Sequence, residues 1–548
     1  MDDSAADVYY APIALTETER REHIRERLLV KLLGLRTLTL LKENPNRYWD
    51  IIGTAIVVTL AAILRFWMLG RPKTLIFDET YYVKDAFTLW QLGFEAQWPD
   101  NANIAFEAGD VFSFTNDAAF VVHPQVGKWL IALGMAVGGG ATNPLAWRLA
   151  NAIFGVIAVW LVIRIARRLF ASTAMGLIAG LFMSVDGGAI VHSRTALLDQ
   201  FLMVFALAAF GALLLDREQY RWRLANTYAG ITDNSIPKFR WWLLAAGILL
   251  GLAAGVKWSG IYFLAIFGLL SVWWDFQARR IVAGKRLTGQ FWRGLMRGAF
   301  TSFMTLVPTA IITYVATWFS WFITPGAWGR QWASNNPGLG PAWLQPLLRS
   351  FWHYHGQMWT FHTGLSAEHP YAANPLGWLI QWRPTVFYWR QGAEVAELPE
   401  CAGLADCVMS VTSLGNPILW WLACASFLII AIGLVKRDWR ALAAISGVIA
   451  GWTPWLLYTD RTIFTFYSIA FTPWMIFTLG YACTVLLEFR AAPNSVALWG
   501  SGTLTARAIV IALVLTILAV SALFYPIWTA QPIEFTHWQS LMWLPSWI

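Results

Sequence analysis

The sequence predicts an all-α polytopic membrane protein with about 11 transmembrane helices and two large extracytoplasmic loops. Of its 548 residues, 57% are hydrophobic and only 13% are charged, whereas soluble domains carry about 25% charged residues. Apolar runs of about 20 residues, the length that crosses a bilayer, recur along the chain. Basic residues are scattered between these runs, which is typical of membrane topology and argues against a nucleic-acid partner despite the net charge of +8.

Residues 1–49 are predicted to form a cytoplasmic N-terminal arm. They lack a short apolar core followed by small residues, so we expect no removable signal peptide. Residues 17–42 carry a basic amphipathic pattern, which predicts a helix lying on the membrane surface.

The remaining chain divides into two groups of spans. We predict an N-terminal catalytic module (50–323) and a C-terminal four-span module with an outer tail (416–548). The eleven predicted spans are residues 50–69, 146–163, 172–189, 196–215, 241–256, 259–275, 298–323, 416–435, 441–458, 462–487 and 508–525. Residues 126–137 are too short to span and end in glycines, so we expect a helix along the outer surface. Most of the 40 Lys and Arg then face the cytoplasm, with the N-terminus inside and the C-terminus outside.

Two outer segments are large, at residues 70–145 and 324–415. The second is rich in tryptophan, which favours the membrane interface, so we expect it to lie on the bilayer. Cys401 and Cys407 lie in this loop and are disulfide candidates in an oxidising compartment. No metal-type spacing, P-loop or dinucleotide fingerprint is present, so we expect no cofactor and an energy source within the substrate.

Two adjacent carboxylates, Asp78 and Glu79, follow the first predicted span. A carboxylate near hydrocarbon is costly unless it is solvated, paired or bound to something. One interpretation is a catalytic base with a supporting acid beside it. The alternative is that both residues only cap a helix over residues 80–90. A divalent cation held by these two residues and Asp199 is a weaker hypothesis.

Other charged side chains gather at the predicted outer ends of the spans: His123, Lys128, Arg148, Arg194, Asp199, Lys257 and Arg461. Each has a simpler explanation. Lys257 or Arg461 alone is typical of an anchor that snorkels to the interface. His123 precedes a proline and is typical of a loop hydrogen bond, and Arg194 and Asp199 are close enough in sequence to pair. Cations are otherwise sparse on this side, so the set as a whole favours one cavity.

Such a cavity suits the transfer of a sugar carried on a lipid phosphate. Lys, Arg and His bind the phosphate and stabilise the charge that it gains on leaving. A carboxylate takes the proton of the attacking hydroxyl. Because phosphate is a good leaving group, one base and several cations suffice, whereas hydrolysis of an ordinary glycoside uses two carboxyl groups.

The ordered motifs resemble the protein O-mannosyltransferases, membrane glycosyltransferases with the GT-C architecture. The resemblance covers residues from about 50 to 525 and rests on Phe77-Asp78-Glu79-Thr80-Tyr81-Tyr82, the His-Pro-x-x-Gly-Lys element at 123–128, Arg194 with Leu198-Asp199, Gly255-Val256-Lys257-Trp258-Ser259-Gly260, His369-Pro370-Tyr371, Trp382-Arg383-Pro384, the run from Leu414 to Trp421, and Arg461 with Phe464.

This resemblance implies an inverting enzyme of the cell membrane that moves mannose from a polyprenyl- or dolichyl-phosphate donor to Ser or Thr of secreted proteins. It implies that Asp78 is the base, that Glu79 orients the base or the acceptor, and that Arg148 and Lys257 belong to the active site. Two departures are visible. The loop 324–415 is too short for the β-trefoil domain of eukaryotic members, which fits the bacterial, especially actinobacterial, branch with a polyprenyl donor. Gln125 replaces the second proline of the usual His-Pro-Pro.

Two other functions fit parts of the pattern. A related GT-C enzyme would move another lipid-linked sugar, such as arabinose, to a lipid or glycan. A transporter of lipid-linked sugars would carry broken spans, paired repeats and charges at mid-membrane. The charges here instead gather at one face, which favours the transferase.

Overall fold

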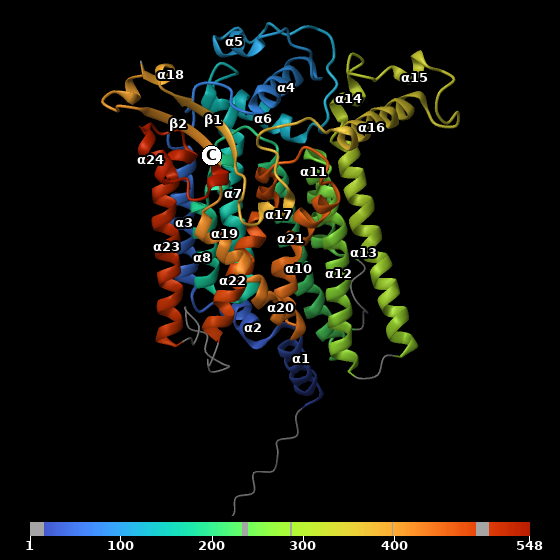
Figure 1. The fold of residues 1–548 in the computed structure, drawn as a ribbon. Coiled ribbons are helices and arrows are strands. Elements are labelled where there is room, and N and C mark those ends of the chain that lie inside the picture. The colour runs from blue at the N-terminus through green and yellow to red at the C-terminus, as the bar shows by residue number, and fades with distance from the viewer. Residues whose placement is uncertain (1–15, 233–238, 285–287, 397, 489–502) are drawn as a thin grey trace, which may run out of the picture.

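The computed structural model describes residues 16–232, 239–284, 288–396, 398–488 and 503–548. Long helices run roughly side by side through the molecule, and short helices and a small sheet cover one end of this bundle (Figure 1). Helices α1 and α2 lie at the opposite end. We call the end that carries the sheet the site end.

Nine helical segments of the described chain are long and apolar enough to cross a membrane. They are α3 (Arg47–Phe66), α7 (Pro144–Phe170), α10 (Asp199–Tyr228), α12 (Gly260–Ala283), α13 (Gly289–Ala316), α19–α20 (Pro417–Ala425, Phe427–Val435), α21–η2 (Trp439–Trp452, Thr453–Leu457), η3–α22 (Thr465–Phe471, Thr472–Glu488) and α23 (Leu504–Trp528). Helices α8 (Thr173–Val185) and α9 (Gly187–Ser193) form a pair bent by 62°, which makes up to ten. The one remaining predicted span, residues 241–256, is α11 (Trp241–Val256). Its 16 residues rise about 24 Å, less than the roughly 30 Å thickness of the hydrocarbon core.

The predicted polytopic helical class is therefore confirmed, and the predicted number of spans is close to the observed nine or ten. The helices pack closely where glycine replaces a side chain. A Cβ at Gly180 of α8 would lie 2.1 Å from Ile163 of α7, and a Cβ at Gly447 of α21 would lie 1.9 Å from Trp474 of α22. These contacts are too short for any larger residue, so glycine sets the spacing between these helices.

The N-terminal arm packs on the protein itself. Helix α1 (Glu17–Leu33) begins with a capping box at Thr16, and Gly34, with a φ of +85°, separates it from α2 (Leu35–Lys42). Leu29, Leu32 and Leu33 are buried in one cluster with Tyr220 and Leu224 of α10. The apolar stripe predicted to face the membrane surface is thus buried at least in part against the end of α10.

Shorter helices build the site end: α4 (Glu79–Leu92), α5 (Ala102–Glu107), α6 (Val126–Gly138), α14 (Phe319–Ile323), α15 (Trp332–Asn335), α16 (Pro346–Gly364), α17 (Pro375–Trp378), α18 (Ala393–Ala396) and α24 (Phe535–Ser540), with the 3-10 turns η1 (Pro399–Cys401) and η4 (Pro545–Trp547). Helix α6 matches the short helix predicted at residues 126–137. Its 13 residues are too few to cross a bilayer.

A three-stranded antiparallel sheet, which the sequence analysis did not predict, lies at the site end. Its order is β1 (Thr385–Gln391), β2 (Cys407–Ser413) and β3 (Ile533–Glu534). A disulfide joins Cys401 to Cys407 at the start of β2, the pair expected from the sequence. The sheet ties the tryptophan-rich loop to the C-terminal tail.

Candidate active site

Glu79 is fully buried, and both oxygens of its carboxylate are occupied by the protein. Arg148 donates to it through Nε and Nη2, each at 2.8 Å. The backbone N–H groups of Ala196 and Ile76 donate to the same carboxylate at 2.8 and 3.1 Å. The remaining bonds of Arg148 go to the carbonyls of Leu69, Pro72 and Thr74. Glu79 is therefore an ion-paired positioning residue that fixes the loop before α4, and its lone pairs are not free to take a substrate proton.

Asp78 is placed differently. It occupies the N-cap position of α4 but makes no side-chain capping bond, which disfavours the helix-capping alternative for this residue. The side chain is half-buried. Burial raises the pKa of Asp78 to about 6, and the nearby Lys257 opposes this rise while Asp199 adds to it. A carboxyl with such a pKa is a suitable general base near neutral pH.

The backbone that aims Asp78 is strained and held in place. Phe77 has a φ of +48°, a left-handed conformation that costs a residue with a side chain on the order of 1–3 kcal/mol. Its ring stacks on Phe387 of β1, with centroids 4.5 Å apart and planes 13° apart. The rings of Phe464 and Phe466 meet it edge-on at 6.2 and 5.3 Å. This aromatic packing compensates for the strain and fixes the direction of Asp78.

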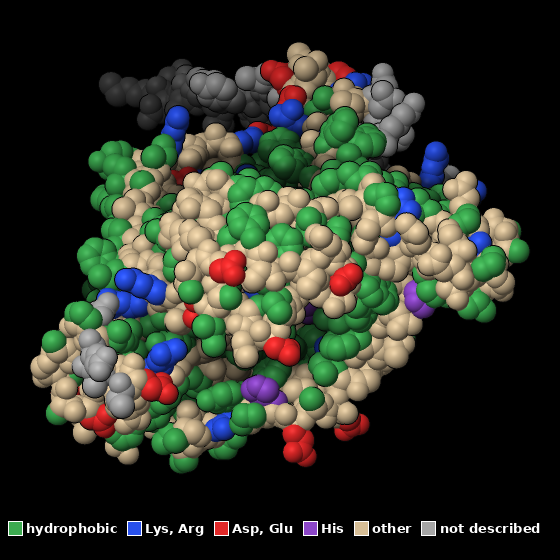
Figure 2. All heavy atoms as spheres, turned by 90° about the horizontal axis from the view of Figure 1, so that it is seen from above, with side chains coloured by type: hydrophobic (Ala, Val, Ile, Leu, Met, Phe, Trp, Pro, Cys, Tyr) green, Lys and Arg blue, Asp and Glu red, His purple; other side chains and the backbone are tan. Residues whose placement is uncertain are grey.

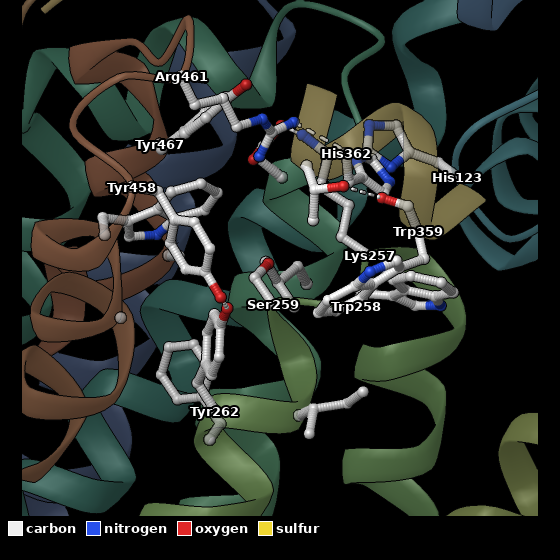
Figure 3. A pocket seen from close by; sticks show the side chains of 18 residues that line it. His123, Lys257, Trp258, Ser259, Tyr262, Trp359, His362, Tyr458, Arg461 and Tyr467 are labelled. Atoms are coloured by element: carbon white, nitrogen blue, oxygen red, sulfur yellow. Dashed lines mark hydrogen bonds and ion pairs between the residues drawn. The ribbon is translucent and has the colours of Figure 1, made fainter. Parts of the chain in front are cut away.

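A cavity of about 290 Å³ is lined by Lys257 and Asp199, the two residues whose charges act on Asp78. Seen from above, the site end is hollowed, and histidine and basic side chains are visible inside the hollow (Figure 2). The polar and aromatic residues that line the cavity come from several separate elements (Figure 3): His123, Asp199, Lys257, Trp258, Ser259, Tyr262, Trp359, His362, Thr363, Trp455, Tyr458, Arg461 and Tyr467. The lining thus brings together residues that are up to about 340 positions apart in the chain, which only a folded bundle can do.

Lys257 and Asp199 form one wall of the cavity. The Nζ atom of Lys257 lies 2.7 Å from Oδ2 of Asp199, and it also lies 5.1 Å from the centre of the Tyr467 ring. Lys257 follows directly after α11. Lys257 is only 7% exposed, so the turn after α11 is buried within the bundle.

Arg461 and two histidines form a second polar wall. Nε2 of His362 donates to the Val122 carbonyl at 2.8 Å, so Nδ1 is left to accept from Arg461 at 3.2 Å. Burial and the charge of Arg461 lower the pKa of His362 to about 4, which keeps it neutral. His123 stacks on His362 at 5.3 Å, and its buried Nδ1 has no hydrogen-bond partner among the described residues. Burial lowers the pKa of His123 well below its usual value, so this nitrogen suits a neutral contact to a substrate hydroxyl.

Aromatic side chains complete the cavity. Nε1 of Trp258 donates to the Tyr314 hydroxyl at 2.9 Å, which in turn lies 2.7 Å from Nε2 of His355. This chain fixes the indole ring of Trp258. The hydroxyls of Tyr262 and Tyr458 face each other at 3.5 Å, as Figure 3 shows. Rigid aromatic faces with polar edges are well suited to bind a sugar ring and an adjoining lipid.

Five predicted site residues do not line this cavity: Asp78 and Glu79, described above, and Lys128, Arg148 and Arg194. Lys128 is buried and pairs with Glu95, which also accepts from Gln125 at 3.1 Å. Arg148 clamps Glu79, as described above. Arg194 donates to carbonyls at and just after the end of α3, those of Arg65, Trp67 and Met68. The simpler alternative that Arg194 pairs with Asp199 is therefore wrong, because Asp199 pairs with Lys257. These cations hold loops in place instead of facing the cavity.

No motif in the sequence alone marked His362, Tyr262 or Tyr467 as site residues. His362 lies at the end of a helix in the tryptophan-rich loop, where no spacing marks it as part of a site. Tyr467 lies only six positions after Arg461, so its place near a predicted site residue could have indicated it. Across the part of the chain that the structure describes, no group of three or more His, Cys, Asp or Glu is arranged to hold a metal ion.

Membrane-spanning helices that carry a carboxylate and several cations to one end define a polytopic membrane glycosyltransferase of the GT-C type. Residues 137–324 match the family profile "Dolichyl-phosphate-mannose-protein mannosyltransferase", and residues 347–547 match "C-terminal four TMM region of protein-O-mannosyltransferase". The polyprenol-phosphate-mannose–protein mannosyltransferase of Mycolicibacterium smegmatis is 36% identical over 521 residues, covering 90% of this chain and 92% of the relative. The chain therefore belongs to the protein O-mannosyltransferase family.

Two further comparisons agree with this assignment. The enzyme of the same name from Corynebacterium glutamicum is 30% identical over 540 residues, covering 94% of this chain and 97% of the relative. The structure of the Saccharomyces cerevisiae protein O-mannosyltransferase Pmt1-Pmt2 complex bound to the sugar donor has a TM-score of 0.68 at 16% identity, covering 91% and 92% of the two chains. The latter likeness shows a shared fold.

Proposed function

We propose that this protein transfers mannose from polyprenyl-phosphate mannose to Ser or Thr hydroxyls of polypeptides, with inversion at the anomeric carbon. Asp78 takes the proton of the acceptor hydroxyl as its oxygen attacks C1 of the mannose. The bond between C1 and the phosphate oxygen breaks on the opposite face, and the lipid phosphate leaves with the electron pair. The relatives named above carry this donor and a protein acceptor in their names.

One observation carries the proposal. Asp78 is a half-buried carboxyl whose raised pKa is influenced by Lys257 and Asp199, and that pair lines a cavity with cations on two walls. Glu79 next to it is fully engaged by Arg148. The two neighbouring carboxylates therefore have different roles in this proposal. Asp78 accepts the proton, and Glu79 holds the loop.

The donor phosphate is assigned to Lys257 and Arg461. These two cations line the cavity from different elements, and a phosphate between them would exchange contacts with Asp199 and His362 for charge-assisted bonds. The growing charge on the leaving phosphate is then stabilised without a protonated acid. We assign the sugar to the aromatic surface around Trp258 and Tyr262, and no cofactor is needed for this step.

We further propose that the protein resides in the plasma membrane with the site end outside. Basic residues such as Arg164, Arg167 and Arg168 gather at the predicted cytoplasmic ends of the spans, in agreement with the positive-inside rule. The disulfide between Cys401 and Cys407 at the site end fits an oxidising compartment. Secreted polypeptides would then meet the cavity as they leave the cell.

The full chain reconstituted in liposomes with labelled polyprenyl-phosphate mannose and a Ser/Thr-containing peptide tests this function. We expect label on the peptide in an α-linkage, and we expect no competition from polyprenyl-phosphate arabinose. Transfer of arabinose instead of mannose would support the related glycosyltransferase. Movement of the labelled lipid across the bilayer without transfer to the peptide would support a transporter and contradict our proposal.

The activity should depend on pH through Asp78. Because the ionised carboxylate is the reactive form, kcat/KM for the peptide should be constant above pH 7 and fall as pH drops through about 6, the pKa of Asp78. Well below this pKa it should fall about tenfold per pH unit. Initial rates between pH 4.5 and 8 measure this profile.

The control for this profile is Asp85→Asn. Burial also raises the pKa of Asp85, to about 7, but this residue lies further along α4, and the charges that act on it are those of Lys128, Glu95 and Lys84 instead of Lys257 and Asp199. The inflection should persist in this variant. A flat profile down to pH 4.5 in the unaltered protein would show that Asp78 is not the base.

A further inference from the structure

Strand β1 is an edge strand, because the order of the sheet is β1-β2-β3. Among the described residues, β1 pairs only with β2, from Thr385 opposite Ser413 to Gln391 opposite Val408. An edge strand presents unpaired N–H and C=O groups, which are a template for another extended chain. The sheet lies at the site end of the bundle, as do α4 and α6 (Figure 1).

The bonds of β2 show which groups of β1 point outward. The carbonyl of Ser410 accepts from the N–H of Ala530, so the backbone groups of Ser410 point away from β1. In an antiparallel pair, the residue opposite such a position also directs its N–H and C=O away from its partner strand. Trp389 stands opposite Ser410, so the N–H and C=O of Trp389 point to the free edge. Because backbone directions repeat every two residues along a strand, the N–H and C=O of Gln391 also point to the free edge.

The same strand touches the base-bearing loop. The register with β2 shifts between Val386 and Tyr388, which leaves Phe387 as the extra residue of a β-bulge. Bulges redirect a side chain and often lie beside active sites. Here the bulged Phe387 stacks on Phe77, the residue immediately before Asp78. Strand β1 therefore contacts the loop that carries the proposed base, two residues before the outward backbone groups of Trp389.

We infer that the acceptor polypeptide binds as an extended strand along the free edge of β1, which brings a Ser or Thr hydroxyl to Asp78. This inference rests on the proposed function and adds the mode of acceptor recognition. Main-chain hydrogen bonds to Trp389 and Gln391 would bind the peptide without reading its sequence, which suits an enzyme with varied acceptors. A lipid surface does not fit, because hydrocarbon cannot satisfy unpaired backbone groups.

A scan of N-methylated acceptors tests this mode of binding. Peptides with a single Thr are methylated at one backbone nitrogen at a time, within three residues on either side of the Thr. Because alternate N–H groups of a strand face its neighbour, methylation at alternate positions should raise the peptide KM by about tenfold or more. The positions between them should change KM less than about twofold, which corresponds to less than one net hydrogen bond.

The outcomes separate the two proposals. No transfer to the unmethylated peptide would contradict the proposed function itself. Normal transfer to that peptide with equal tolerance, or equal loss, at all positions would contradict strand binding alone. A period of two along the peptide would support it.

A variant pair on the enzyme provides the matching evidence. Trp389→Pro removes an outward N–H without removing a bond to β2, and Trp389→Ala is the control because the Trp389 side chain also packs on Trp538. We expect the proline variant to show a peptide KM about tenfold above that of the alanine variant, with the same KM for the donor lipid. Equal peptide KM values for two folded variants would overturn the inference. If the proline variant does not fold, the scan of methylated peptides tests the inference by itself.

Discussion

Replacing Asp78 with Asn should reduce transfer from the lipid donor by roughly a thousandfold, within the range of about 10²–10⁴ that a general base contributes. Asn has nearly the shape of Asp but cannot take the proton of the acceptor hydroxyl. Asp78 makes no side-chain capping bond to α4, so this change should leave the fold intact. Turnover of labelled polyprenyl-phosphate mannose at saturating peptide measures the effect on kcat.

Two further measurements make the Asp78→Asn result specific. Thermal unfolding in detergent should match that of the unaltered protein, and the donor lipid should bind with similar affinity because Lys257 and Arg461 are unchanged. A loss of activity that accompanies a lower unfolding temperature would reflect misfolding. A folded Asp78→Asn variant with activity within tenfold of normal would contradict the assignment of the base.

Replacing Arg148 with Met should destabilise the fold by about 3–5 kcal/mol, the cost of leaving one member of a buried ion pair without its partner. Arg148 and Glu79 are both fully buried, and the change also leaves the carbonyls of Leu69, Pro72 and Thr74 without their donor. Chemical unfolding in mixed micelles measures the loss. Activity should fall as well, because the loop that aims Asp78 depends on this clamp.

The double variant Glu79→Gln with Arg148→Met tests the physical cause. It removes the buried charge that the single change leaves unpaired, so it should recover part of the lost stability. Lys42→Met is a suitable comparison, since Lys42 forms an exposed pair with Glu26 and such pairs contribute little. If Arg148→Met unfolds like the unaltered protein, the clamp does not stabilise the loop.

Much of the fold could be predicted because it depends on local composition. All eleven predicted spans are helical in the structure, since apolar runs of this length must satisfy their own backbone groups in a bilayer. The sheet could not be predicted, because β1 and β3 are about 140 residues apart and β3 has only two residues. The bend between α8 and α9 lies at Asp186, Gly187 and Gly188, where Asp186 caps α9, so this break did have a local signal in the sequence.

The candidate site was predicted in outline. Asp78, Asp199, Lys257 and Arg461 were identified by their place at the ends of the spans, and the structure brings Asp199, Lys257, Arg461 and the predicted His123 to the lining of one cavity. Lys128, Arg148 and Arg194 have the same kind of position in the sequence but bond to carboxylates and carbonyls of the protein. The position of a charged residue at the end of a span therefore indicates that it has a function or a partner, but it does not show whether the residue lines the cavity or holds a loop.

By itself, the sequence determined that this protein is a bundle of membrane helices with a carboxylate pair and several cations beside the ends of its spans. Only the tertiary structure decided that Arg148 and two backbone N–H groups occupy the carboxylate of Glu79, while Asp78 makes no side-chain capping bond. The physical reason is that the role of a buried charge depends on which partner neutralises it. For Glu79 these partners, Arg148 and Ala196, come from segments 69 and 117 residues away, and no local pattern encodes such a meeting.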